Sequence, residues 1–193
     1  MRIVGGELRG RPIRTPEGDA TRPTSDRARE AIFNILAHAP WSPGLEDARV
    51  IDLFAGSGAM GLEALSRGAA ACLFVERADP ALATIRGNLD AFALTSRARL
   101  LRQDATRLGR RVDEEAAFDF AFLDPPYGQG LGETALMALN AGGWLAQSAV
   151  VVLERGADEG ELSLPGFEAL DRRRYGVAGV TFLAPLPRTA GER

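Results

Sequence analysis

The residues whose types and spacing point to chemistry lie in Phe118–Gly130, a segment that reads FDFAFLDPPYGQG. An apolar run typical of a buried strand leads to Asp124, which is followed by two prolines and then Tyr127. Because proline has no backbone N–H to give to a neighbouring strand, we expect the strand to end at this acid. The pattern therefore predicts a carboxylate, a stiff backbone and an aromatic ring together at a strand end.

That combination suits chemistry on the amino group of a nucleobase. Such a nitrogen is a poor nucleophile because its lone pair is delocalised into the ring, and two acceptors that hold both of its hydrogens turn the lone pair outward. We expect Asp124 to supply one acceptor and the carbonyl oxygen of Pro125 the other, while Tyr127 stacks on a base drawn out of its helix. Positioning and electrostatics would then carry the rate. A plain strand-ending turn is the alternative, since Asp-Pro favours turns.

A second candidate site is the glycine-rich segment DLFAGSGAMG, which lies between a predicted strand and a predicted helix. Gly56, Gly58 and Gly61 form a G-x-G-x-x-G pattern, whose glycines let the backbone approach a ligand closely. Glu76 ends the next predicted strand, where its carboxylate can accept both hydroxyls of a ribose. The alternative is a tight turn that needs glycine for its own sake.

The glycine pattern leaves two ligands open, because NAD and S-adenosylmethionine both carry a ribose. NAD would also place a pyrophosphate at the helix N-terminus, where Asp52 would repel it, whereas the cationic amino acid end of S-adenosylmethionine suits a carboxylate. Asp104 closes a third predicted strand. Four acids therefore lie at or near the ends of successive strands, at the edge where a doubly wound sheet binds its ligands: Asp52, Glu76, Asp104 and Asp124.

The elements that position these acids alternate between strand and helix from residue 49 onward. Continuous apolar strands with helices between them predict a mostly parallel α/β sheet covered on both faces. The tail at 168–186 breaks this alternation and predicts an antiparallel hairpin at the sheet edge. The predicted strands cover 49–55, 70–76, 97–104, 118–124 and 148–154, and the predicted helices cover 59–68, 79–94 and 131–143.

The first part of the chain has a different character. Residues 1–16 alternate around Gly-Gly and Arg-Gly and predict short strands with tight turns. Residues 24–38 predict an amphipathic helix with Thr24 or Ser25 as its cap. We therefore expect a hairpin-and-helix unit over 1–40 and a single compact domain over 41–193.

Charge is unevenly distributed along the 193 residues. The net charge is −3, and all 23 basic residues are arginine, since the chain contains no lysine. Residues 1–29 carry seven arginines against four acids, whereas the remainder carries sixteen arginines against twenty-two acids. A basic arm on an acidic body suggests an anionic partner at that end, although a solvated surface hairpin fits the charge equally well.

The overall composition is that of an ordinary soluble domain, with 46% hydrophobic and 25% charged residues. The opening residues MRIVGGELRGRP hold arginine and glycine where a signal peptide would be apolar, and no apolar run suits a membrane span. A single cysteine, Cys72, excludes an internal disulfide, and with a single histidine we expect no zinc site. These features predict a cytoplasmic protein without a metal.

The order DLFAGSG, VE, QDA and DPPY resembles class I S-adenosylmethionine-dependent methyltransferases that act on exocyclic amino nitrogens. The opening blocks MRIVGGELRGRPIRTP and TRPTSDRAREAIFNIL, with DLFAGSGAMGLEALSRGA and RRRYG, resemble the bacterial RsmD family, which methylates guanine N2 in 16S ribosomal RNA. The resemblance covers nearly the whole chain. Lysines that often help RNA contact in such enzymes are arginines here, so the contact geometry does not carry over in detail.

The resemblance implies a Rossmann-like methyltransferase with a mostly parallel seven-stranded sheet, acting as a monomer on 16S rRNA, free or in a partly assembled small subunit. It implies S-adenosylmethionine as cofactor. Residues implied to hold the cofactor are Asp52, Gly56 and Gly58 at the methionine part, Glu76 at the ribose, Asp104 and Ala105 at the adenine, and Arg22 and Thr24 at the carboxylate end. Residues implied to meet RNA phosphates are Arg2, Arg9, Arg11 and Arg14.

Other functions stay open at this point. One is an amino-methyltransferase for DNA adenine, another RNA base or protein glutamine, which shares the DPPY motif but not the opening block. An NAD-dependent oxidoreductase would explain the glycines but leave Asp52 and DPPY without a role. A non-catalytic RNA-binding module would have no need for intact acids at the strand ends.

Overall fold

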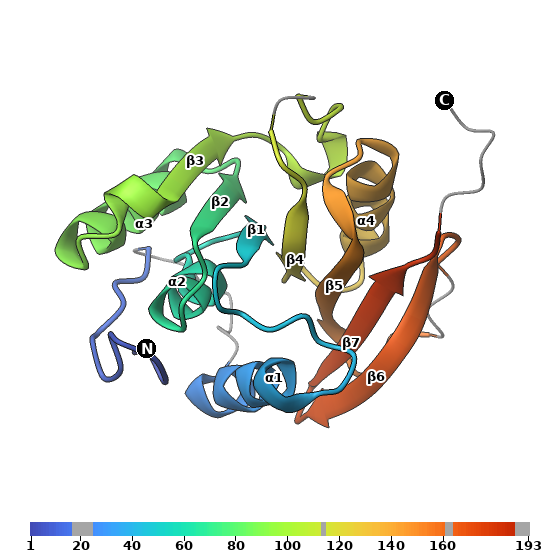
Figure 1. The fold of residues 1–193 in the computed structure, drawn as a ribbon, viewed down its shortest axis with the longest axis horizontal. Helices are drawn as coiled ribbons and strands as arrows, with labels where there is room; N and C mark the ends of the chain where they lie inside the picture. Colours follow the sequence, from blue (N-terminus) through green and yellow to red (C-terminus); the bar gives the residue numbers. More distant parts are fainter. Residues whose placement is uncertain (17–24, 113–114, 161–163, 188–193) are drawn as a thin grey trace.

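The computed structural model describes residues 1–16, 25–112, 115–160 and 164–187. Its described strands form one seven-stranded sheet in the order β3-β2-β1-β4-β5-β7-β6 (Figure 1). Strands β1 to β5 pair in parallel, whereas β7 pairs antiparallel with both β5 and β6. This confirms the predicted mostly parallel sheet with an antiparallel hairpin at its edge. The strands are β1 Arg49–Leu53, β2 Ala71–Glu76, β3 Ala98–Arg102, β4 Phe118–Leu123, β5 Leu145–Gly156, β6 Phe167–Tyr175 and β7 Ala178–Pro185.

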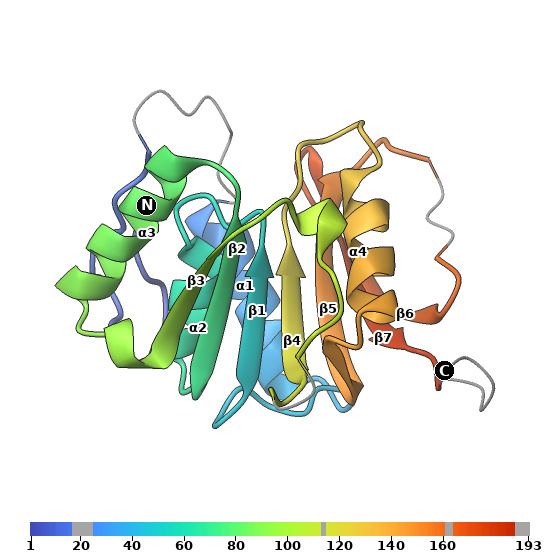
Figure 2. The same cartoon turned by 90° about the horizontal axis from the view of Figure 1, so that it is seen from above.

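Helices cover both faces of this sheet (Figure 2). One buried apolar cluster joins α1, α2 and α3 to one face, and a second cluster joins α4 and a short 3-10 turn to the other face. The continuous apolar runs in β1, β2 and β4 follow from this arrangement, because both sides of each strand are buried. The helices are α1 Asp26–His38, α2 Ala59–Ser66, α3 Asp79–Ala91 and α4 Leu131–Ala141, with 3-10 turns η1 Thr95–Arg97 and η2 Ala105–Arg107.

Residues 1–16, which we call the N-terminal arm, form a tighter and less regular structure than the predicted short strands. The arm is closed by a single antiparallel bridge between Arg2 and Pro12. Ile3 N–H donates to the Arg11 carbonyl at 2.9 Å, and Ile13 N–H donates to the Met1 carbonyl at 3.0 Å. Ile3 and Ile13 are buried in the same cluster as α1 and α2, so the arm packs onto the core.

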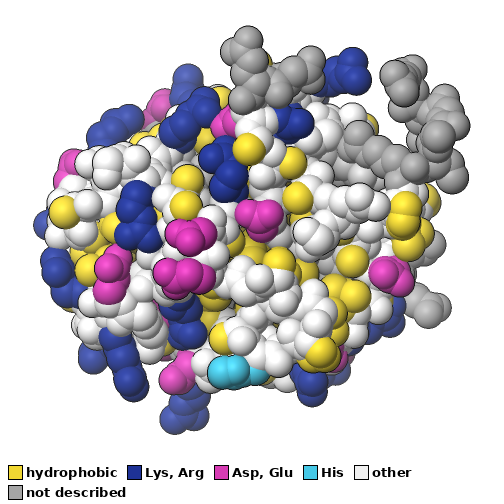
Figure 3. Space-filling view, viewed as in Figure 1, with side chains coloured by type: hydrophobic (Ala, Val, Ile, Leu, Met, Phe, Trp, Pro, Cys, Tyr) yellow, Lys and Arg dark blue, Asp and Glu magenta, His cyan; other side chains and the backbone are white. Residues whose placement is uncertain are grey.

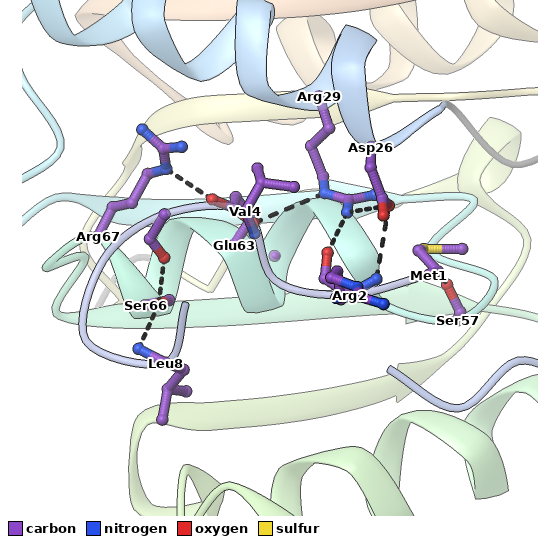
Figure 4. A network of polar contacts seen from close by, with 12 residues as sticks. Met1, Arg2, Val4, Leu8, Asp26, Arg29, Ser57, Glu63, Ser66 and Arg67 are labelled. Carbon is purple, nitrogen blue, oxygen red and sulfur yellow. Dashed lines mark hydrogen bonds and ion pairs between the residues drawn. The ribbon is translucent and has the colours of Figure 1, made fainter. Parts of the chain in front are cut away.

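Two of the arm's other backbone N–H groups donate to side chains of α2 (Figure 4). Val4 N–H donates to the carboxylate of Glu63 at 2.8 Å, and Leu8 N–H donates to the Ser66 hydroxyl at 2.9 Å. That hydroxyl in turn donates to the Gly5 carbonyl at 2.7 Å. These partners lie 58 to 61 residues away along the chain.

A buried ionic cluster completes this attachment. The side chains of Arg29 on α1 and Glu63 on α2 are both fully buried, with Arg29 Nε 3.6 Å from a Glu63 carboxylate oxygen. Arg29 also donates to the Arg2 carbonyl and pairs with Asp26 at 2.8 Å. Arg67 pairs with the other Glu63 oxygen at 2.7 Å. The cluster therefore binds the arm, α1 and α2 to one another.

None of the helices within the described ranges is long and apolar enough to cross a membrane.

Replacing Arg29 with Met should destabilise the protein strongly, because it leaves the buried Glu63 carboxylate without that cation and frees the Arg2 carbonyl. Removing one partner of a buried pair costs about 3–5 kcal/mol. Arg27→Met, an exposed position on the same helix, is the matched control and should change little. The free energy of unfolding in urea decides the question, and equal values for the two variants would contradict this account of the cluster.

Candidate functional site

Parallel pairing brings the strand-end acids to one edge of the sheet. Leu53 at the end of β1 lies in register with Val75 of β2 and with Leu123 of β4. Asp52 precedes that row, and Glu76 and Asp124 follow it. These strands point the same way in Figure 2, so the carboxylates lie along one edge. The register therefore brings these three acids to neighbouring strand ends, as expected from the sequence.

Asp52 lies beneath the glycine-rich loop rather than at its open surface. Its side chain is only 3% exposed, and one carboxylate oxygen accepts the Gly61 N–H of α2 at 2.9 Å. Burial raises the pKa of this carboxyl well above its ordinary range, and the nearby carboxylates of Asp124 and Glu76 add to that rise. The acid thus sits where a positive group placed over the loop would relieve a strong electrostatic cost.

Glu76 holds the glycine-rich loop from the neighbouring strand. One carboxylate oxygen accepts the Gly56 N–H at 3.0 Å, and the other accepts the N–H groups of Arg77 and Ala78 at 2.7 and 2.8 Å. Glu76 as a whole is half-buried. The residue proposed from sequence as a ribose acceptor is therefore also a backbone clamp.

The glycines of the loop have separate reasons to be glycine. Gly58 begins α2 with a φ of 79°, and a Cβ there would lie 3.2 Å from Ile85 and Phe74 side-chain atoms. Gly56 has a φ of 53°, and the nearest atom to a Cβ there would be the Phe54 carbonyl at 3.9 Å. The first position is constrained by packing, whereas the second leaves open space over the backbone.

Asp104 caps the 3-10 turn that follows β3. One of its oxygens accepts both the hydroxyl and the N–H of Thr106, at 2.7 and 2.9 Å, and these bonds lower the pKa of the Asp104 carboxyl. Arg77 and Arg107 lower it further. Ala105 is 4% exposed and belongs to the apolar cluster under α4.

The DPPY segment follows the end of β4 and lies close to α4. Asp124 is half-buried and Pro125 is buried. Helix α4 approaches so closely that a Cβ added at Gly132 would lie 3.2 Å from the Pro125 ring. The Tyr127 ring remains 40% exposed. A stiff carboxylate-bearing turn beside a partly exposed ring is therefore present, as the sequence predicted.

The end of β5 supplies residues that sequence reasoning missed. Glu154, only 6% exposed, accepts the Tyr127 hydroxyl at 2.6 Å. Glu159 accepts the Gly128 N–H at 2.9 Å and the Gly156 N–H at 3.0 Å. Burial, and then the bond to Glu154, raise the pKa of the Tyr127 phenol, so it is a neutral donor near pH 7. The signal was in the sequence, because Glu154 follows the apolar run AVVVL as the other acids follow theirs.

The arm presents its arginines next to α3. The Arg11 guanidinium lies 5.1 Å from the centre of the Phe92 ring and donates to the Ala91 carbonyl at 2.8 Å. Arg14 N–H donates to the Asn88 side chain at 2.9 Å. Arg9 is exposed, as is Arg2. The two residues predicted to close over a cofactor carboxylate, Arg22 and Thr24, lie outside the described residues.

Arginine side chains gather mainly over the half of the molecule that holds the arm, α2 and α3, with acidic side chains among them (Figure 3). Within the described ranges, no group of three or more His, Cys, Asp or Glu is placed to hold a metal ion. The candidate site described above consists of carboxylates, the glycine backbone and one tyrosine.

Comparison with known proteins gives consistent matches over the whole described fold. The family model for conserved hypothetical protein 95 matches residues 1–184. The ribosomal RNA small subunit methyltransferase D of Escherichia coli K12 is 37% identical over 179 residues, covering 93% of this chain and 85% of that protein. YlbH of Bacillus subtilis is 37% identical over 185 residues, covering 93% and 96%. The solved structure of yhhF from Escherichia coli superposes with a TM-score of 0.82 at 33% identity, covering 97% and 99%.

Asp52 and Asp104 should respond oppositely to pH when each is replaced by Asn. The folded pKa of Asp52 is raised, so its stability contribution is present below the unfolded value of about 3.9 and is lost as pH rises through the folded pKa. Asp52→Asn should therefore stabilise the protein near pH 7, by an amount that shrinks toward pH 4.

The folded pKa of Asp104 is lowered, so its contribution is present above about pH 3.9 and is lost as pH falls. Asp104→Asn should destabilise near pH 7 and matter less in acid. Urea unfolding of both variants and the wild type across pH 3.5–8 gives the change in unfolding free energy caused by each substitution as a function of pH. If this change had the same pH dependence for both substitutions, the two carboxyl groups would not have the opposite pKa shifts described above.

Proposed function

The chain belongs to the RsmD family of methyltransferases, the family of conserved hypothetical protein 95, and on that premise we propose that it methylates the N2 amino group of a guanine in 16S rRNA, with S-adenosylmethionine as cofactor. One observation carries the proposal. The DPPY turn at the end of β4 stands beside the glycine-rich loop at the end of β1, on neighbouring parallel strands. Because this family consists of methyltransferases, nothing supports the alternative of an NAD-dependent oxidoreductase.

The groups at this edge fit S-adenosylmethionine by their chemistry. The edge offers carboxylates from three strand ends, Asp52, Glu76 and Asp104, which suit a cationic amino acid end and neutral ribose and adenine hydrogen-bond donors. A pyrophosphate would meet these negative charges. The open space over Gly56 allows a ligand to approach the loop backbone. When bound, the cofactor supplies a methyl group already activated by a positively charged sulfur.

The DPPY turn then orients the amino group that receives the methyl group. The Asp124 carboxylate and the Pro125 carbonyl each accept one hydrogen of the target amino group, which directs the nitrogen lone pair out of the base plane. The Tyr127 ring, anchored by its hydroxyl to Glu154, offers its exposed face for stacking on the extruded base. Asp124 acts mainly by orientation and electrostatics, so a strong general base is unnecessary.

The choice of rRNA and of guanine rests on separate supports. The relatives named as ribosomal RNA small subunit methyltransferase D support a small-subunit rRNA substrate. The N2 position of guanine follows from the family resemblance, because two acceptors fit any exocyclic amino group. We further propose that residues 1–40 form an RNA-binding extension of the methyltransferase unit over 41–193, and that the protein acts as a monomer in the cytoplasm.

Substitutions at Asp124 test the proposed chemistry. Asp124→Asn keeps one acceptor oxygen and should reduce methyl transfer, whereas Asp124→Ala removes the acceptor and should slow transfer on the order of a hundredfold or more, by analogy with losing one preorganised electrostatic partner. Calorimetry should show cofactor binding in both variants. The measurement is single-turnover transfer to a 16S rRNA fragment, followed by nucleoside mass spectrometry.

Asp158→Ala is the matched control, because this acid is 87% exposed beyond the end of β5. It should transfer methyl at the wild-type rate. Transfer by Asp124→Ala at that same rate would remove the proposed role of the carboxylate. A methylated adenine or cytosine in place of N2-methylguanosine would instead overturn the proposed base.

Replacing Arg9, Arg11 and Arg14 together with Ala should weaken RNA binding and flatten its dependence on salt. Each lost phosphate contact should reduce the slope of log affinity against log salt by about 0.7 to 0.9. The control removes the same charge from β6, at Arg172, Arg173 and Arg174, where Arg173 and Arg174 are already paired with Asp171 and Asp158. Flattening by the β6 triple but not by the arm triple would move the RNA contact to the other end of the sheet.

A further inference from the structure

Asn88 on α3 makes a set of contacts that none of the proposed roles uses. Asn88 is only 1% exposed although its side chain is a polar amide, and it lies in the last turn of the helix. Its carbonyl oxygen accepts the Arg14 N–H at 2.9 Å, and its amino group donates to the Arg14 carbonyl at 3.0 Å. The same amino group donates to the Ser57 carbonyl at 3.1 Å. One amide thus holds both backbone groups of an arm residue and one backbone group of the glycine-rich loop.

The two segments that meet at Asn88 belong to different proposed sites. Ser57 lies between Gly56 and Gly58, in the loop proposed to hold the methionine part of the cofactor. Arg14 belongs to the arm proposed to meet RNA phosphates. The arm also touches this loop at its other end, where the Ser57 hydroxyl lies 3.9 Å from the Met1 sulfur.

The geometry of an amide makes these contacts interdependent. The carboxamide is planar, and its two N–H hydrogens are both in use, one toward the arm and one toward the loop. A rotation of the side chain that follows a shift of Arg14 therefore also moves the donor that holds Ser57. Because the group is buried, water does not replace a bond that is lost.

We propose that Asn88 is a positioning residue that couples the arm to the cofactor loop, so that RNA bound to the arm strengthens binding of S-adenosylmethionine, and the cofactor strengthens RNA binding by the same factor. This inference rests on the proposed function. An anion held by the arm restricts Arg14 and, through Asn88, the Ser57 carbonyl, so the cofactor meets a loop that is already ordered. The reciprocity of the two effects is required by thermodynamic linkage.

The test is the affinity for S-adenosylmethionine, measured by calorimetry with and without the 16S rRNA fragment used for methyl transfer. In the wild type, the fragment should raise the affinity about fivefold or more. Asn88→Asp keeps the oxygen that accepts from Arg14 but loses both donated bonds, and the ratio should fall to near one. Asn34→Asp makes the same chemical change at an exposed position on α1 and should keep the wild-type ratio.

Two further variants isolate the bond on the arm side. Arg14→Ala and Arg14→Pro both remove the guanidinium, but only proline also removes the N–H that Asn88 accepts. Both should weaken RNA binding. The coupling ratio should be lower in the proline variant than in the alanine variant, and equal ratios would contradict a route through this backbone bond.

A measurement on the unaltered protein covers the case in which Asn88 variants fail to fold. Hydrogen exchange at Gly56, Ser57 and Gly58 should slow when the RNA fragment is added without cofactor. The coupling is overturned if the RNA fragment leaves this exchange unchanged. It is also overturned if the fragment leaves the wild-type affinity for S-adenosylmethionine unchanged while the protein still methylates the fragment. Either result leaves the proposed function standing. A wild type that neither binds the cofactor nor methylates RNA overturns the proposed function itself.

Discussion

The parallel register of β1, β2 and β4 is the constraint on which the rest of the structure depends. It places Asp52, Glu76 and Asp124 along one edge, where their charges repel and where burial makes the charged form of Asp52 costly. Backbone N–H groups offset part of these costs: Gly61 donates to Asp52, whereas Gly56 and the turn after β2 donate to Glu76. The result is an edge of closely spaced carboxylates whose charged forms are costly, and this environment suits the positively charged cofactor that we propose.

The arm depends on the same half of the sheet. Besides hydrogen bonds within the arm, its backbone is held by Glu63 and Ser66 on α2 and by Asn88 on α3. Helix α2 starts at the glycine-rich loop, and α3 follows directly from the strand that carries Glu76. The helices that hold the arm are therefore the helices that flank the glycine-rich loop and the Glu76 strand end. The proposed RNA-binding arm is therefore attached to the same two helices as the strand-end acids, and this attachment is the basis of the coupling proposed above.

Sequence patterns predicted the sheet and most of the edge, because both depend on local periodicity and on where apolar runs end. Helix α3 and strand β2 fall where Pro80 and Glu76 indicated. The arm was less predictable, because its hydrogen bonds go to side chains about 60 to 75 residues away, which no local pattern reveals. Arg29 lies in the predicted amphipathic helix and is fully buried, because α1 packs against the arm as well as the sheet. The position of Glu154 at the end of an apolar run could have been recognised in the sequence, but its contact with Tyr127 depends on the path of the chain after β4.

The account's central claim is that this edge methylates N2 of a guanine in 16S rRNA. Mass spectrometry of nucleosides from 16S rRNA, comparing cells that contain the protein with cells that lack it, tests this claim most directly. The account predicts that N2-methylguanosine falls by one residue per 16S rRNA in cells that lack the protein, and that the wild-type gene restores it. Unchanged N2-methylguanosine, or loss of a methylated adenine or cytosine instead, would contradict it.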